Sequence, residues 1–197
     1  DAVISELEIR ANDFDGRGAP VSIYFGGGTP GMWPAERIGD VIAAINSRFG
    51  RHPECEITVE FNPEDAEPEC LASLRQTGVN RLSFGIQSFD DNLLGQLGRA
   101  HSGEQAQHAV RVAESAGFQN ISVDLMHGYI GQSLQGALDD VRTACELPIQ
   151  HISSYQLTIE DKTLFGRRAR RGESLLESDE RLVEMFPELR RLMALKG

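Results

Sequence analysis

The chain alternates between strand-like and helix-like segments at intervals of about thirty residues, which limits its fold more than any other feature. Short runs rich in β-branched and aromatic residues are typical of strands, and they occupy residues 21–25, 56–61, 81–86, 121–126 and 151–157. Apolar residues at helical spacing separate them, most clearly at 38–49, 106–113 and 134–141, with a weaker pattern around Leu71 and Leu74. The alternation predicts right-handed βαβ units, a parallel sheet and an α/β fold.

Polar or glycine residues follow or interrupt each predicted strand near its carboxyl end, where ligands gather in parallel α/β folds. These positions are 26–29, Glu60, Gln87, Asp124 and Gln156. Gln87 and Gln156, taken alone, are explained by the strand leaving its apolar layer. Glu60 and Asp124 each lie between apolar residues, so each carboxylate needs a ligand, a cation or a hydrogen-bond network. A purely structural network remains an alternative at this point.

Three consecutive glycines, Gly26, Gly27 and Gly28, come directly after the first predicted strand. Glycine in such a run indicates positive φ angles or a close approach of the backbone to another molecule. A glycine turn can bind phosphate, but such a turn usually has a cation nearby, and no Lys or Arg follows closely here.

Composition excludes several kinds of partner. The 197 residues carry a formal net charge of −11, which disfavours binding to nucleic acid or to an anionic membrane. No apolar run is long enough to span a bilayer, and the first residues do not resemble a signal peptide, so we expect one domain in the cytoplasm. Cys55, Cys70 and Cys145 are far apart, and their spacing indicates reduced thiols rather than a metal site. The arginine-rich run at 167–171 predicts a solvated loop, with anion binding as the alternative.

Five motifs in one order resemble the radical S-adenosylmethionine (SAM) enzymes of the oxygen-independent coproporphyrinogen III oxidase group, and most closely its haem-chaperone branch. The motifs are YFGGGTP, EITVEFNPE, GVNRLSFGIQSF, LGRAH and SVDLMHG, and the resemblance runs from about Ser22 to Phe165. It implies a partial (βα)6 barrel of the TIM type, in which the five strands are the second to the sixth.

The resemblance also implies a set of SAM-binding residues. Gly27, Gly28 and Thr29 match the turn that lies against the methionyl amino group. Family analogy adds four residues to the site: Glu60, Gln87, Arg99 and Asp124. Carboxylates suit ribose hydroxyls or an ammonium group, an amide suits hydroxyls, and an arginine suits a carboxylate. His101 and His127 remain outside this set, because lone histidines are usually structural.

Radical SAM chemistry needs a [4Fe-4S] cluster held by a CxxxCxxC loop, and this chain has no such motif. We therefore expect residues 1–197 to be a single core-domain fragment that is inactive alone. Its first strand and cluster loop would precede Asp1, and the C-terminal family domain would follow Gly197. The resemblance implies that the parent binds SAM, the cluster and a porphyrinogen or haem, as an oxidoreductase. One alternative is a non-catalytic haem-transfer protein, and another is an unrelated barrel enzyme that binds a phosphorylated metabolite at the GGGT turn.

Overall fold

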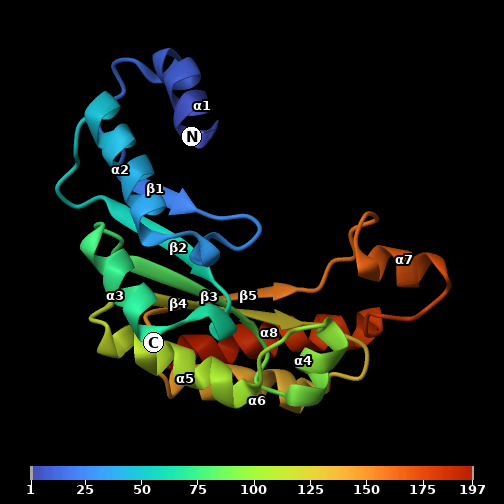
Figure 1. The fold of residues 1–197 in the computed structure, drawn as a ribbon. Helices are drawn as coiled ribbons and strands as arrows, with labels where there is room; N and C mark the ends of the chain where they lie inside the picture. The colour runs from blue at the N-terminus through green and yellow to red at the C-terminus, as the bar shows by residue number, and fades with distance from the viewer. Residues whose placement is uncertain (1, 197) are drawn as a thin grey trace.

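The computed structural model describes residues 2–196, in which one sheet of five parallel strands follows the order of the chain (Figure 1). The strands are β1 (Ser22–Phe25), β2 (Glu56–Phe61), β3 (Arg81–Gln87), β4 (Ile121–His127) and β5 (His151–Gln156). Each pairs with the next in parallel. The α/β fold and all five predicted strands are confirmed, with boundaries that differ by one residue at most.

Helices precede, separate and follow the strands (Figure 1). They are α1 (Ala2–Arg10), α2 (Ala35–Phe49), α3 (Pro68–Gln76), α4 (Asp91–Leu97), α5 (Gly103–Ser115), α6 (Leu134–Cys145), α7 (Leu164–Arg170) and α8 (Asp179–Lys196). Ser102 and Gln105 form a reciprocal capping box at the start of α5, as the sequence predicts. The expectation of a loop at 167–171 is wrong for most of that run, because Arg167 to Arg170 lie in α7.

The strands divide their side chains by type between the two faces of the sheet. On β2, Val59 and Phe61 are fully buried in the main hydrophobic core, which also holds Phe84, Val123 and residues of α2, α3, α5, α6 and α8. Glu60 lies between them in sequence and points to the opposite face, because successive side chains of a strand alternate. We call this opposite side the polar face; it carries Tyr24, Glu60, Ser83, Asp124 and Tyr155. The apolar neighbours of Glu60 and Asp124 therefore mark the alternation of a strand rather than an apolar surrounding.

Asp140 of α6 is a buried carboxylate away from the polar face. Its oxygens accept hydrogen bonds from the Ser88 hydroxyl at 3.0 and 2.8 Å and from the Phe89 amide at 2.7 Å. Burial raises the pKa of Asp140 from 3.8 to about 6, although these hydrogen bonds act in the opposite direction. Asp140 thus joins the end of β3 to α6 while it takes up a proton more readily than an exposed aspartate.

We expect Asp140 to make the folded state lose stability as the pH rises from about 4 to about 6. The Asp140 carboxyl binds its proton more tightly in the folded state than in the unfolded state. Its contribution to the free energy of unfolding is therefore complete below pH 4 and lost above pH 6, and it amounts to about 3 kcal/mol. Urea unfolding of Asp140→Asn at several pH values should lack this component, whereas Asp139→Asn, at the exposed neighbouring position, should keep it. If the free energy of unfolding changes with pH in the same way in the wild type and in Asp140→Asn, Asp140 is not the source of this pH dependence.

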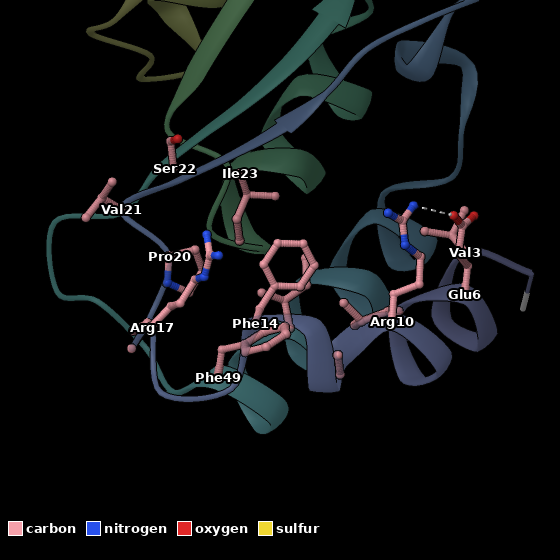
Figure 2. Close-up of a pocket in the computed structure, with 15 residues that line it drawn as sticks. Val3, Glu6, Arg10, Phe14, Arg17, Pro20, Val21, Ser22, Ile23 and Phe49 are labelled. Carbon is pink, nitrogen blue, oxygen red and sulfur yellow. Dashed lines mark hydrogen bonds and ion pairs between the residues drawn. The ribbon is translucent and has the colours of Figure 1, made fainter.

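The outer edge of β1 borders a large apolar cavity. Within the described residues β1 pairs with β2 alone, so its other edge carries unpaired backbone groups. The cavity measures about 710 Å³ and lies between α1, α2 and β1, where the side chains of Phe14, Ile23 and Phe49 surround it (Figure 2). No residue of the predicted SAM site lines this cavity.

We expect the exposed edge of β1 to drive self-association, because an unpaired strand edge is a template for another strand. Sedimentation velocity should show dimers or larger species that grow with concentration. Val21→Lys places a charge at this edge, where Val21 is 66% exposed, and should shift the chain toward monomer. Val183→Lys on α8, where the side chain is 73% exposed, is the matched control and should leave association unchanged. A wild-type chain that stays monomeric at high concentration rules the prediction out.

Candidate functional site

Glu60 fastens the glycine turn to the sheet. Its Oε2 accepts a hydrogen bond from the Gly27 amide at 2.9 Å, and its Oε1 accepts one from the Tyr24 hydroxyl at 2.8 Å. Burial and the adjacent Glu60 carboxylate together raise the pKa of Tyr24 to about 12. Glu60 therefore has a satisfied structural role, and it also places a negative charge directly against the turn.

The three glycines serve two different geometrical needs. At Gly26 a Cβ atom would lie 2.7 Å from the Tyr24 ring and 3.0 Å from Glu60 Oε1, so a side chain has no room. At Gly27 and Gly28 the φ angles are +84° and +66°, which residues other than glycine rarely adopt. The turn thus exposes bare backbone at the carboxyl end of β1.

Asp124 lies on the polar face of β4, two strands away from Glu60. It accepts a hydrogen bond from the Ser83 hydroxyl at 3.4 Å, and Ser83 is the register partner of Glu60 on β3. Burial raises the pKa of Asp124, the Glu60 carboxylate raises it further, and hydrogen bonds from Ser153 and Ser83 lower it. Two carboxylates therefore face the same small space, where a cationic or hydroxyl-bearing ligand would relieve their mutual repulsion.

Arg99 reaches this space from the loop after α4. Its Nη2 donates to the Gly85 carbonyl at 2.6 Å and to Asn62 Oδ1 at 2.9 Å, while Asn62 Nδ2 donates to Thr29 Oγ1 at 3.3 Å. Among the described residues, Arg99 Nε is a buried donor with no hydrogen-bond partner. An unpaired buried donor is costly in a folded protein, so Arg99 has capacity left for an anionic group.

Gln87 has a strained backbone conformation. It is the one residue other than glycine with a positive φ among residues 2–196, at 72°, and it follows an irregularity in the pairing of β3 with β4. Its Oε1 accepts a hydrogen bond from the Tyr155 hydroxyl of β5 at 2.9 Å. Strained backbone of this kind gathers at functional sites, because the surrounding structure must hold it in place.

The structure brings the sequence-predicted residues together at the carboxyl edge of the sheet. A pocket of about 180 Å³ is lined by Gly28, Thr29, Glu60, Phe61, Asn62, Ser83, Gly85, Asp124 and Tyr155. The other three predicted residues contact the lining through hydrogen bonds. Gly27 bonds to Glu60, and Arg99 bonds to Asn62 and Gly85. Gln87 bonds to Tyr155.

Sequence reasoning missed four residues that build this site. They are Tyr24, Asn62, Ser83 and Tyr155. A signal was present, because Tyr24, Ser83 and Tyr155 occupy the alternate positions of their strands that share a face with Glu60 and Asp124.

The residues of the pocket fit SAM better than they fit an iron–sulfur cluster. Two carboxylates, an amide and a partly unpaired arginine match an ammonium, ribose hydroxyls and a carboxylate. The volume of about 180 Å³ is below the usual range for whole ligands, so the pocket has room for only part of a molecule of that size. Cysteines that could hold a cluster are not brought together: Cys55, Cys70 and Cys145 lie in separate elements, and residues 2–196 contain no group of three His, Cys, Asp or Glu placed to hold a metal.

The two histidines next to the site have structural contacts. His101 is buried, with Nδ1 at 3.0 Å from Glu64 Oε2 and Nε2 at 3.0 Å from the Ile86 carbonyl. Its contacts tie the segment after β2 to β3. His127, at the end of β4, lies 3.4 Å from the Ser154 hydroxyl, and burial lowers its pKa.

The parallel sheet, with a bare glycine turn and two convergent carboxylates at its carboxyl edge, has the arrangement of α/β proteins that bind small ligands at that edge. Residues 4–144 match the radical SAM superfamily, and the chain belongs to this superfamily, in its coproporphyrinogen III oxidase and haem chaperone group. The family implies binding of SAM and of a [4Fe-4S] cluster.

Relatives with curated names include two bacterial haem chaperones. The chain is 40% identical over 176 residues to the heme chaperone HemW of Haemophilus influenzae, covering 89% of this chain and 45% of the relative. The corresponding values for HemW of Escherichia coli are 38% identity, 89% of this chain and 46% of the relative. The chain thus spans about half the length of the curated relatives it matches.

Solved structures agree with the fold. Coproporphyrinogen III oxidase (HemN) from Escherichia coli, described as a radical SAM enzyme, superposes with a TM-score of 0.84 at 26% identity, over 100% of this chain and 45% of that one. The archaeal Elp3 of Methanocaldococcus infernus has a TM-score of 0.74 at 18% identity, covers 94% of this chain and 48% of that one, and supports the fold alone. The partial TIM-like barrel expected from the sequence is therefore confirmed. None of the helices within residues 2–196 has the length and apolar character needed to cross a membrane.

Proposed function

We propose that this chain binds SAM at the carboxyl edge of its sheet, as the SAM-binding core of a radical SAM protein of the haem chaperone branch. The observation that carries the proposal is the hydrogen-bonded assembly around Glu60, in which the Gly27 amide and Tyr24 hold the carboxylate against the glycine turn. SAM carries an ammonium and a sulfonium group, and both are attracted to such a carboxylate.

Each predicted residue has a proposed partner on SAM. The backbone of Gly27 and Gly28 and the Thr29 hydroxyl receive the methionyl ammonium. Arg99 receives the methionyl carboxylate through its unpaired Nε. The ribose hydroxyls hydrogen-bond to Glu60, Gln87 or Asp124. In the parent protein, cleavage of SAM by one electron from a [4Fe-4S] cluster would supply hydrogen-abstraction chemistry, and the role of these residues would be to bind and orient SAM.

The parent protein is proposed to handle haem or a porphyrin in the cytoplasm. The chaperone branch is favoured over the oxidase because the chain is 40% identical to a heme chaperone and 26% identical to coproporphyrinogen III oxidase. A non-catalytic haem-transfer protein that binds SAM and a cluster fits the same residues. Binding of a phosphorylated metabolite at the turn is disfavoured, because the Glu60 carboxylate already takes the Gly27 amide and would repel a phosphate.

Calorimetry on the 197-residue chain tests the SAM site. We expect weak binding of SAM, weaker binding of S-adenosylhomocysteine, which lacks the sulfonium charge, and no binding of inorganic phosphate. Anaerobic incubation with iron and sulfide should give neither cluster absorbance nor 5′-deoxyadenosine, because the three cysteines lie apart. Binding of phosphate without SAM, or cleavage of SAM by this chain alone, would overturn the proposal.

A further inference from the structure

The short helix α7 and Arg171, the residue directly after it, form a cationic stripe in a strongly acidic chain. Four arginines fall within five positions, at 167, 168, 170 and 171, although the chain as a whole has a net charge of −11. Such a local excess of positive charge attracts small anions that the rest of the surface repels.

Two of the four arginines are already paired. Arg168 Nε donates to Glu173 Oε2 at 2.6 Å, and Arg170 donates to the Asp161 carbonyl at 2.6 Å with Asp161 Oδ1 at 3.7 Å. Arg167 and Arg171 are exposed and have no ion pair among the described residues. They are the cations that remain available to a ligand.

Arg167 and Arg171 share one side of α7 with an exposed apolar residue. Arg167 lies in α7 and Arg171 is its C-cap residue, four positions later, so their Cβ atoms are about one helical turn apart, roughly 6 Å. Leu164, three residues before Arg167, falls on the same side and is 59% exposed. The stripe therefore offers an apolar contact followed by two guanidinium groups, which suits a flat apolar molecule with two carboxylates on one edge.

The stripe is held in place at the carboxyl side of the sheet. The Phe165 ring meets the Tyr129 ring edge-on at 6.0 Å between centroids, and Tyr129 lies two residues after the end of β4. The Thr163 hydroxyl caps the helix by accepting from the Gly166 amide at 3.1 Å. In Figure 1 α7 stands beyond the carboxyl ends of the strands, on the side of the sheet where the glycine turn also lies.

We propose that Arg167 of α7 and Arg171 at its C-terminal end bind the two carboxylates of a tetrapyrrole, with Leu164 against its ring. The inference rests on the proposed function for the ligand class, and it adds the surface that recognises the ligand. Haem carries its two propionates on neighbouring rings of one edge, so both can reach a pair of guanidinium groups one helical turn apart.

Haemin titration of the full 197-residue chain, followed by difference absorbance, tests this surface. The double variant Arg167→Gln/Arg171→Gln should bind haemin about 10-fold or more weakly than the wild type. The control Arg51→Gln/Arg111→Gln removes the same charge from two exposed positions elsewhere and should bind as the wild type does. Haemin dimethyl ester, whose propionates are esterified, should bind the wild type as weakly as haemin binds the α7 variant.

The outcomes separate the two proposals. Wild-type binding that the α7 variant retains overturns the α7 site and leaves the proposed function standing. Equal losses of haemin affinity in the α7 variant and the control indicate general charge attraction and overturn the α7 site. Equal binding of haemin and its dimethyl ester to the wild type overturns the α7 site as well. A wild-type chain that binds no haemin overturns both the α7 site and haem as a ligand of this chain, while SAM binding by calorimetry remains a separate result.

Discussion

Glu60→Gln weakens SAM binding to this chain by about 10- to 100-fold, the loss expected when a charged hydrogen-bond partner becomes neutral. The substitution also alters the turn: the amide oxygen can still accept from the Gly27 amide, but the NH2 group must then donate to the Tyr24 hydroxyl, which reverses that hydrogen bond. Calorimetry with SAM at millimolar concentration measures the effect.

Glu56→Gln is the matched control for this experiment. Glu56 lies on the same strand and the same face as Glu60, four residues earlier, at the end of β2 away from the pocket. It should leave SAM binding unchanged. Equal effects of the two substitutions, or unchanged binding by Glu60→Gln, would remove Glu60 from the site.

Gly103→Ala destabilises the fold by about 3 kcal/mol, the upper range for overpacking. Gly103 is the first residue of α5, and a Cβ atom there would lie 2.2 Å from the Phe89 carbonyl oxygen. Backbone cannot move aside as a flexible side chain can, so α5 or the segment after β3 has to shift. That segment also carries the amide that binds Asp140, which couples the damage to the core.

Gly95→Ala on α4 provides the contrast. A Cβ atom at Gly95 has no neighbour within 4 Å, so alanine should stabilise the helix by up to about 1 kcal/mol. Urea unfolding followed by circular dichroism compares the two variants with the wild type. Similar stabilities for Gly103→Ala and Gly95→Ala contradict the packing argument.

Much of the fold was determined by local patterns of sequence. Runs rich in β-branched and aromatic residues identified the five strands, and helical spacing identified α2, α5 and α6, because both patterns depend on residues close together in the sequence. Ser102 and Gln105 identified the start of α5 for the same reason. Glu60 and Asp124 became candidate site residues because apolar residues flank each carboxylate in the sequence, although those neighbours point to the other face of the sheet.

The tertiary structure decided which residues those carboxylates meet. Tyr24 donates to Glu60 across 36 positions of sequence, and that contact depends on the register of β1 against β2. The unpaired Nε of Arg99 and the positive φ of Gln87 follow from how the loop after α4 and the end of β3 pack. Local periodicity says which face of a strand a residue occupies, but the register and irregularities between strands set the distances across that face, and these exist only once the sheet has formed.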